Sequence, residues 1–443
     1  MANDNKRALF VTRLGGIAAA VGSAVGLGNI WRFPYETGQN GGAAFILIYI
    51  LCVLFLGTPL LLAELTLGRI THRNPVGAYK ALAPKAKTAW SLIGYVGATT
   101  MLLIVGFYSV VAGWTLSYSA GAIADNIPNF GEYSQSFGGP IVWLTIFILL
   151  NLFILLGGVQ KGIERASNIL VPFLGVILII LCINSLMLPK ASLGLNFLFH
   201  PDFSKIDSSV VISALGQSFF SISVGISCLL TYGSYLGDTT KMGKTAISIT
   251  LLDTLIAILA GIIIFPACYQ FGVEPGAGPG LAFITLPEVF SQMTGGYWLC
   301  VMFFVLLAVA ALTSTLSMFE TPITILVEEF GLKRRNAVIT VCIIGEVLGL
   351  GCAMSFIPEY TSSFSIFGYS LFDAFDKLSA NILMPTCGML MSIFAGWIID
   401  KKLLRNAFSN NGTENSWFYK PFMFAVRFIA PICILLIFIS GLA

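Results

Sequence analysis

Charged side chains are scarce in this sequence, and the residue patterns of enzymes and metal proteins are missing from it. Asp, Glu, Lys and Arg together make up only 10% of the 443 residues, and the two histidines, His72 and His200, lie in loops far apart. The nine cysteines form no CxxC pair and lie almost entirely in apolar stretches, so we interpret them as small buried side chains. Because no nucleophile is paired with a base, the sequence argues against an enzyme.

The shortage of charge also limits the partners. The net charge is only +3, and the basic residues are spread among loops rather than gathered in one stripe, so no nucleic-acid partner is expected. Hydrophobic residues, in contrast, make up 57% of the chain, and the mean hydropathy is +0.89. This composition lies far outside that of soluble domains and indicates a membrane protein.

Apolar segments long enough to cross a bilayer, which takes about 20 helical residues, recur along the whole chain. The fold class is therefore an all-α polytopic membrane protein whose surface faces the lipid bilayer, and we treat residues 1–443 as a single transmembrane domain. We count eleven spans: residues 13–38, 42–69, 89–123, 139–157, 166–187, 209–236, 243–272, 298–330, 336–355, 366–399 and 418–441.

The basic residues predict the orientation of these spans. If the N-terminus is cytoplasmic, nearly all loop lysines and arginines fall inside, and only Lys190, Lys205 and Lys377 face out. The odd number of spans then places the C-terminus, Ala443, outside. The expected location is the inner (plasma) membrane of a cell.

The first span is interrupted. Residues 22–34, GSAVGLGNIWRFP, place three glycines, an asparagine and an arginine near the middle of an apolar segment. Where the chain leaves the helix inside a bilayer, its backbone N–H and C=O groups lose their helical partners and must bind another group of the protein or a ligand. Carbonyls near Gly22, Ala24 and Val25 could bind a cation, and the N–H groups of Leu27 and Gly28 could bind a carboxylate. Close packing of helices through Gly22 and Gly26 is the alternative.

The sixth span contains a second interruption five spans later. Its centre, SFFSISVGIS, carries Ser218, Ser221, Ser223, Gly225 and Ser227. Two glycine-interrupted segments in corresponding positions of two halves are a sequence sign of a transporter with an inverted repeat and a binding site at mid-membrane. We therefore predict repeats over about 13–187 and 209–399, followed by an extra helix at 418–441.

Polar groups in the seventh and eighth spans could complete cation sites. Ala310, Thr313 and Ser314 lie on one helical face and, with main-chain oxygens of the first span, form an uncharged oxygen cage suited to a hard monovalent ion. Hydroxyls bonded back to their own helix are the alternative. Asp253 is an acid in an apolar helix, expected to share a second cation with Asn29, unless it is a structural residue satisfied by hydrogen bonds.

Three other acids lie within predicted membrane spans and also need a partner there. We expect Glu64 and Glu320 to accept hydrogen bonds from the two interrupted segments. Glu346 has no partner that the sequence identifies.

Two charge pairs are candidate gates. Arg32 and Asp376 lie on the predicted outer side, and Arg7 and Glu328 lie at the cytoplasmic end. The alternative for the inner pair is a topology marker and a solvated helix end, since exposed pairs contribute little. Between spans seven and eight, residues 274–297 predict an external lid that dips back toward the protein, or else an ordinary surface helix.

These segments together resemble one family. The runs RLGGIAAAVGSAVGLGNIWRFPYETGQNGGAAF, KGIERASNILVP, SFFSISVGIS, ALTSTLSMFE and FDAFDKLSANI resemble the neurotransmitter:sodium symporters, in particular their short bacterial amino-acid transporters with eleven spans. The resemblance covers essentially the whole chain. It implies the leucine-transporter fold, with helices 1 and 6 unwound at mid-membrane. This fold is also the example behind the rule that links two interrupted spans to an inverted repeat.

The resemblance also assigns residues to two coupling sodium ions, with no other cofactor, and to the substrate. One ion would be bound by Ala24, Asn29, Ser221, Asp253 and the substrate carboxylate, and the other by Gly22, Val25, Ala310, Thr313 and Ser314. The substrate carboxylate would meet Leu27, Gly28 and Tyr108, and its amino group the carbonyls of Ala24, Phe220 and Ser221, near Ser223. The side-chain pocket would be lined by Ile104, Tyr108, Phe220, Ser223, Ile226, Ser314 and Met318.

The resemblance also assigns residues to the inner side of the transporter. Phe10 would take the place of a family tryptophan that plugs the inner side, and Gly162 and Pro172 would match a motif that unwinds during inward opening.

Two positions at which this sequence departs from the family pattern bear on whether transport needs chloride. Chloride-dependent relatives have asparagine where Asp253 stands and serine where Ala257 stands, so we expect chloride-independent transport. The expected function is sodium-coupled symport of a neutral, hydrophobic or aromatic L-amino acid by alternating access, with one copy sufficient and a dimer as the alternative. An ion channel and a substrate sensor are the competing functions. A channel needs an aligned polar pore, whereas these polar groups cluster at one depth.

Overall fold

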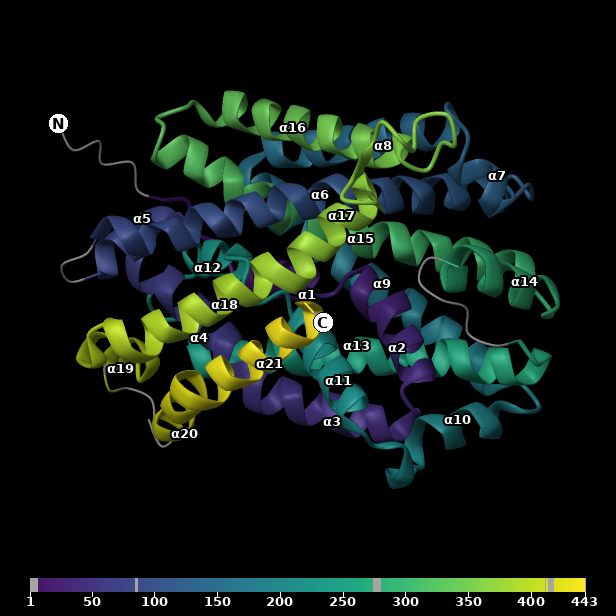
Figure 1. The fold of residues 1–443 in the computed structure, drawn as a ribbon, viewed down its shortest axis with the longest axis horizontal. Coiled ribbons are helices and arrows are strands. Elements are labelled where there is room, and N and C mark those ends of the chain that lie inside the picture. Colours follow the sequence, from purple (N-terminus) through teal and green to yellow (C-terminus); the bar gives the residue numbers. More distant parts are fainter. Residues whose placement is uncertain (1–6, 84–86, 274–279, 411, 413–417, 443) are drawn as a thin grey trace.

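The computed structural model describes all residues except 1–6, 84–86, 274–279, 411, 413–417 and 443, and its chain is almost entirely helical. Long helices run side by side along the longest axis of the molecule (Figure 1). Helix is the form in which an isolated segment satisfies all its backbone hydrogen bonds in lipid, so the apolar runs of the sequence fold this way.

Within the described residues, nine helices are long and apolar enough to cross a membrane, and a tenth is obtained if one bent pair counts as a span. The nine are Ala43–Thr71 (α3, Ala43–Cys52; η2, Val53–Gly57; α4, Thr58–Thr71), Ala89–Ile123 within α6 (Lys87–Ile123), α8 (Gly139–Leu156), Val159–Leu186 (η3, Val159–Glu164; α9, Arg165–Leu186), α13 (Met242–Phe271), α15 (Gly296–Glu328), α16 (Arg334–Met354), Leu371–Ile398 (α17, Leu371–Lys377; η6, Leu378–Leu383; α18, Met384–Ile393; η7, Phe394–Ile398) and Tyr419–Ser440 (α20, Tyr419–Phe424; η8, Ala425–Ile429; α21, Ala430–Leu442).

The remaining two predicted spans are the interrupted ones. The bent pair consists of α1 (Arg13–Ala24) and a second half formed by η1 (Gly28–Arg32) and α2 (Phe33–Gln39), at 54° to each other. The sixth span consists of α11 (Ser208–Ser221) and α12 (Cys228–Gly233), each too short to cross alone. Counted as one span each, they make the fold consistent with the predicted eleven.

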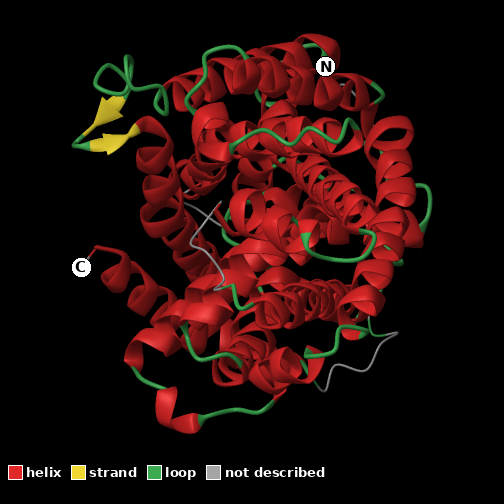
Figure 2. Cartoon of the chain, turned by 90° about the vertical axis from the view of Figure 1, so that its right-hand side faces the viewer, coloured by secondary structure: helices red, strands yellow, loops and turns green. Residues whose placement is uncertain are grey.

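Short elements between the spans were mostly not predicted from the sequence. The helices are α5 (Pro75–Leu82), α7 (Phe130–Ser134), α10 (Ala191–Phe199), η4 (Phe203–Lys205), η5 (Leu281–Thr285) with α14 (Leu286–Ser291), and α19 (Lys401–Phe408). A small antiparallel hairpin of β1 (Ser365–Ile366) and β2 (Tyr369–Ser370) projects from the bundle before α17 (Figure 2). At one end of the molecule lie α5, α19 and α20, and at the other lie α7, α10 and α14 (Figure 1).

The helices differ in how much of their surface is buried. α6 and α15 are mostly buried and pack against each other, whereas α8 and the Tyr419–Ser440 helix expose most of their surface at the outside of the bundle. α1 packs against α9, α15 and α13, so the first interrupted helix lies in the interior. The interruptions are therefore surrounded by protein, as irregular backbone at membrane depth requires.

Candidate functional site

The first break, between Ala24 and Gly28, places its freed carbonyls against α15. Val25 has an extended conformation, with φ −72° and ψ 110°. The hydroxyl of Ser314 donates to the Val25 carbonyl at 2.9 Å and approaches the Gly22 carbonyl at 3.3 Å. A Cβ on Gly22 would lie 3.1 Å from that of Thr313, so the two helices are in close contact here. Carbonyl and hydroxyl oxygens thus gather between α1 and α15.

Thr313 behaves differently from Ser314. Its hydroxyl donates to the Val309 and Ala310 carbonyls of its own helix, at 3.2 and 3.1 Å. This is the back-bonded arrangement common for hydroxyls in membrane helices. All the predicted ligands of this ion nevertheless lie within one small region of α1 and α15.

The second break, at residues 222–227, has a strained backbone. Ser223, Gly225 and Ser227 have φ values of 52°, 84° and 66°, in the left-handed region that serine rarely adopts. Such conformations cost energy and persist only where the surroundings hold them. One support is Glu64, which accepts a hydrogen bond from the N–H of Gly225 at 2.7 Å. The predicted role of Glu64 is thereby confirmed.

A polar cluster of four buried side chains joins the two breaks. Asn29 donates to Asp253 Oδ1 at 2.8 Å and to the Ser221 hydroxyl at 2.9 Å. Ser221 in turn donates to Asp253 Oδ2 at 2.7 Å. Tyr49, which the sequence analysis missed, donates to Ser221 at 3.0 Å. The Asp253 carboxylate is fully buried and lies at the end of each chain of hydrogen bonds.

A small cavity of about 20 Å³ opens between the two breaks. Ten of the eleven predicted substrate residues line it: Ala24, Gly28, Ile104, Tyr108, Phe220, Ser221, Ser223, Ile226, Ser314 and Met318. Asn29, Gly26 and Met384 line it as well, and of these only Asn29 had been assigned a role, as an ion ligand. Leu27 lies just beyond, where its N–H donates to the Tyr108 hydroxyl at 3.0 Å.

A wider cavity of about 260 Å³ lies on the other side of Phe220 and Tyr108, which line both spaces. Arg32 and Asp376 line this wider cavity, here called the vestibule. The Arg32 guanidinium lies over the Phe220 ring, 4.4 Å from its centroid, and forms its ion pair with Glu36 at 3.8 Å. No ion pair joins Arg32 to Asp376, although both line the vestibule, so the closing of these two charges over the site stays a prediction.

Beside the vestibule, the described part of the predicted lid folds as η5 and α14. Phe283 stacks on Phe130 with 5.3 Å between centroids and contacts Trp114, Tyr118 and Trp31 edge-on. This segment is therefore anchored by aromatic contacts next to Trp31, which lines the vestibule. Residues 274–279 of the predicted lid lie outside the described residues.

At the opposite end, the structure contains the predicted pair of Arg7 and Glu328. The other oxygen of Glu328 accepts from the N–H and the side-chain amide of Asn74, both at 2.9 Å. Phe10 packs edge-on against Tyr232 and Tyr235. Together these contacts hold the N-terminal segment across this end of the bundle.

Two acids differ from the expectation. Glu320 accepts from Tyr235, near the end of the sixth span, at 2.6 Å and from Arg334 at 2.8 and 2.9 Å, but not from the unwound residues 222–227, where a partner was predicted. The reason is the α15–α16 turn, which brings Arg334 back onto α15. Glu346, without a partner in the sequence analysis, accepts from Thr145 at 2.6 Å across the α8–α16 contact.

The sequence analysis missed Glu164 altogether. Its carboxylate accepts from the N–H groups of Val11 and Thr12, at 2.8 and 3.0 Å, immediately before α1 begins. The available signal was its position in the run KGIERAS, where it lies two residues after Gly162 and just before a long apolar span. Gly162 lies in the π-helical turn η3, and Pro172 lies within the uninterrupted α9, so their unwinding stays a prediction.

Comparison with known proteins identifies the family. The model of the sodium:neurotransmitter symporter family matches residues 7–137 and 129–443. The uncharacterised sodium-dependent transporter YhdH of Bacillus subtilis is 35% identical over 99% of this chain and 98% of its own length. A sodium-dependent transporter of Haemophilus influenzae is 34% identical over 99% of both chains.

A solved structure gives the same result. The crystal structure of MhsT in complex with L-phenylalanine matches with a TM-score of 0.89 and 39% identity, covering 98% of this chain and 100% of that one. Such a match extends the leucine-transporter fold to this chain. It is a multi-pass, sodium-dependent membrane transporter of a small molecule, and not an enzyme. The chain belongs to the sodium:neurotransmitter symporter family.

Proposed function

We propose that this protein imports neutral, hydrophobic or aromatic L-amino acids together with sodium by alternating access. The observation that carries the proposal is the meeting of both broken helices at one small cavity beside the Asn29–Ser221–Asp253 cluster. Interrupted helices offer dipole ends and free carbonyls to an ionic ligand. An amino acid, with one carboxylate and one ammonium group, suits such a site.

The polar cluster and the α1–α15 contact are the proposed sites of two sodium ions. Ala24, Asn29, Ser221 and Asp253 would bind one, completed by the substrate carboxylate, and Gly22, Val25, Ala310, Thr313 and Ser314 would bind the other. Carboxylate, carbonyl and hydroxyl oxygens are the ligands that hard cations prefer. The coordination shell of the first sodium ion would be incomplete without the substrate carboxylate, so binding of this ion and of the substrate would be coupled directly.

The substrate would lie with its backbone groups at the breaks. The N–H groups of Leu27 and Gly28 and the Tyr108 hydroxyl face its carboxylate, and main-chain oxygens of Ala24, Phe220 and Ser221 face its ammonium group. The side chain would extend toward Ile104, Ile226, Met318 and Met384, which present no charge. A charged side chain is therefore disfavoured there. The relative MhsT, crystallised with L-phenylalanine, supports an aromatic substrate.

The gates complete the proposed cycle. Phe220 and Tyr108 separate the cavity from the vestibule, and Arg32 with Asp376 would close above them. Release to the cytoplasm would require the Arg7–Glu328 pair to separate and the segment around Gly162 to loosen. In this scheme the repeats 13–187 and 209–399 move against each other, the N-terminus is cytoplasmic and Ala443 is external. One copy in the plasma membrane suffices.

The test of this function is transport by the purified protein in liposomes. An inward sodium gradient should drive uptake of one labelled hydrophobic or aromatic amino acid, and the other nineteen, added in turn as competitors, should rank the substrates. Acidic and basic amino acids should compete poorly. Uptake that persists without an inward sodium gradient would contradict the proposal, as would sodium-driven uptake competed best by glutamate or lysine.

Replacement of chloride by gluconate should leave this uptake unchanged. The physical reason is that Asp253 supplies a fixed negative charge next to the proposed sodium site, so no anion from solution is needed to balance the ion there. The measurement is the initial uptake rate at constant sodium, with potassium replacement of sodium as the positive control for loss. A substantial fall in gluconate would show that chloride is required.

A further inference from the structure

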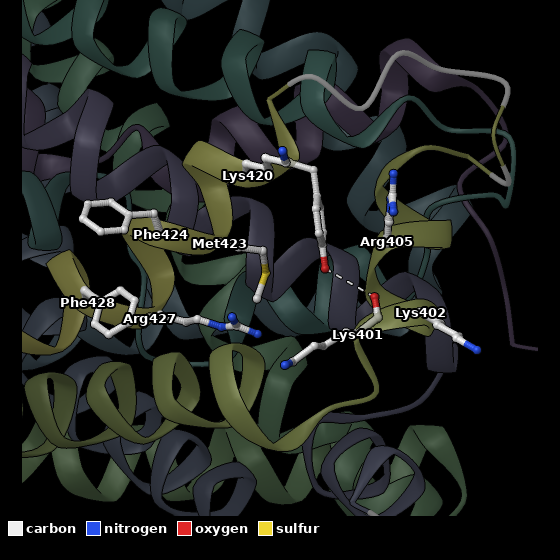
Figure 3. A pocket seen from close by; sticks show the side chains of 9 residues that line it. Lys401, Lys402, Arg405, Lys420, Met423, Phe424, Arg427 and Phe428 are labelled. Carbon is white, nitrogen blue, oxygen red and sulfur yellow. Dashed lines mark hydrogen bonds between the residues drawn. The ribbon is translucent and has the colours of Figure 1, made fainter.

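A cationic cavity of about 430 Å³ lies far from the transport site, at the junction of α19 with α20 and η8. Figure 3 shows it from close by. Its lining contains five basic residues and no acidic one among the described residues: Lys401, Lys402, Arg405, Lys420 and Arg427. The rest of the lining is Tyr419, Met423, Phe424 and Phe428. The cavity is thus cationic on one side and apolar on the other.

Arg427 is fixed in the cavity by its surroundings. Its Nε donates to the Gly396 carbonyl at 2.6 Å, and its guanidinium lies 5.5 Å from the centroid of the Trp397 ring. A Cβ on Gly396 would come within 2.9 Å of the arginine stem, so glycine is what lets the stem pack there. The two terminal nitrogens of Arg427 have no protein acceptor among the described residues. Their N–H groups can therefore donate hydrogen bonds to a bound anion.

Lys401 faces the same space. Figure 3 shows its ammonium group and the Arg427 guanidinium pointing toward each other, while Lys402 points away. The Tyr419 hydroxyl donates to the Lys401 carbonyl at 3.3 Å and fixes the wall between them. None of the ion pairs among the described residues includes any of the five cations. Like charges facing one another without a counter-charge favour a bound anion.

The position of the cavity indicates what kind of anion this is. It lies where one membrane-crossing helix, Leu371–Ile398, ends and the next, Tyr419–Ser440, begins, which is where we expect the boundary of the membrane. Arg69, at the end of α4, binds the Ala407 carbonyl of α19, so the cavity shares the end of the molecule that is predicted to be cytoplasmic. Phe424, Phe428 and Trp397 beside it are 58%, 44% and 55% exposed. Basic groups above exposed aromatic rings match a lipid headgroup above its acyl chains.

We propose that this cavity binds the phosphate headgroup of an anionic phospholipid, with Arg427 and Lys401 on the phosphate and the chains along Phe424 and Phe428. Lys402, Arg405 and Lys420 would supply attraction at the rim. A bound lipid would bridge the ends of the two neighbouring spans, since Lys401 follows the first and Arg427 lies in the second. The proposal is independent of which solute the protein transports.

The test is native mass spectrometry of the delipidated full-length protein, titrated with phosphatidylglycerol or with phosphatidylcholine of the same chains. Wild type should retain one phosphatidylglycerol where it retains no phosphatidylcholine. Because both lysines line the cavity and would attract the anionic headgroup, a Lys401→Gln/Lys420→Gln variant should bind phosphatidylglycerol at least about tenfold more weakly. Both lysines are exposed, so the variant should fold, which retained sodium-driven uptake would verify.

The matched control is Lys333→Gln/Arg335→Gln, which removes two exposed charges at the start of α16, outside the cavity. It should bind phosphatidylglycerol like wild type. An equal loss in this control would mean that general surface charge is responsible and would overturn the proposal. Equal retention of the two lipids, unchanged binding by the cavity variant, or equally tight binding of inorganic phosphate alone would also overturn it.

Discussion

Replacing Gly26 by alanine is expected to weaken substrate binding by at least about tenfold while leaving the fold intact. A Cβ at this position would lie 2.7 Å from both the Ser314 hydroxyl and the Tyr108 hydroxyl, closer than side-chain carbons approach such atoms. These two hydroxyls border the place proposed for the substrate carboxylate. Crowding of this kind typically costs about 1–3 kcal/mol, so binding should weaken by at least about tenfold.

The measurement is equilibrium binding of a labelled substrate to the purified protein in saturating sodium. Gly216→Ala is the matched control, because a Cβ at Gly216, in α11, meets no atom within 4 Å. That variant should bind like wild type, and a comparison of the thermal unfolding of both variants separates a blocked site from a misfolded protein. Wild-type affinity in a folded Gly26→Ala protein would refute the proposed carboxylate position.

Exchanging Asp253 for asparagine should raise the sodium concentration needed for half-maximal uptake by at least about tenfold. The carboxylate accepts hydrogen bonds from Asn29 and Ser221, and an amide of the same shape turns one of its acceptor oxygens into a donor. A donor would then face a donor in a fully buried place, which costs about 1–3 kcal/mol. The variant also loses the fixed charge that would balance the ion.

Sodium titration of uptake with gluconate as the anion measures this effect. Glu346→Gln removes a carboxylate that lies in the α8–α16 contact, where it accepts from Thr145 rather than from any residue of the site. This control should keep the sodium dependence of wild type. If Asp253→Asn required no more sodium than wild type, Asp253 would be a structural residue, as the sequence alone also allowed.

The path of the chain through the membrane could largely be read from the sequence, because long apolar runs have few ways to fold in lipid. The two breaks were also visible, since glycine and serine clusters recur at mid-span in the first and sixth spans, at corresponding positions of the two predicted repeats. That Glu64 accepts a hydrogen bond from an interrupted segment followed from the cost of an unpartnered carboxylate in a membrane helix, although the sequence did not single out Gly225 as the donor. These features depend on local composition, which a sequence displays directly.

Contacts between distant spans were harder to predict. Glu320 and Glu64 look alike in sequence, but Glu320 binds Arg334, and only the folded α15–α16 turn brings the two together. Glu346 and Thr145 lie on different helices, and no spacing rule connects them. Met384 lines the cavity because of how α18 packs, and Arg32 binds Glu36 because a neighbour on the same helix is nearer than Asp376. Side-chain partners across helices require the packing to be known.

The Phe220 ring lines both the cavity and the vestibule, and this limits how substrate preference can change through substitution at this residue. One face lines the cavity and the other supports the Arg32 guanidinium. A substitution at Phe220 therefore alters selectivity and closure together, and we expect such variants to leak or stall. Ile226, Met318 and Met384 line the cavity but not the vestibule. Evolution or engineering toward a new amino acid is therefore easiest at these three residues.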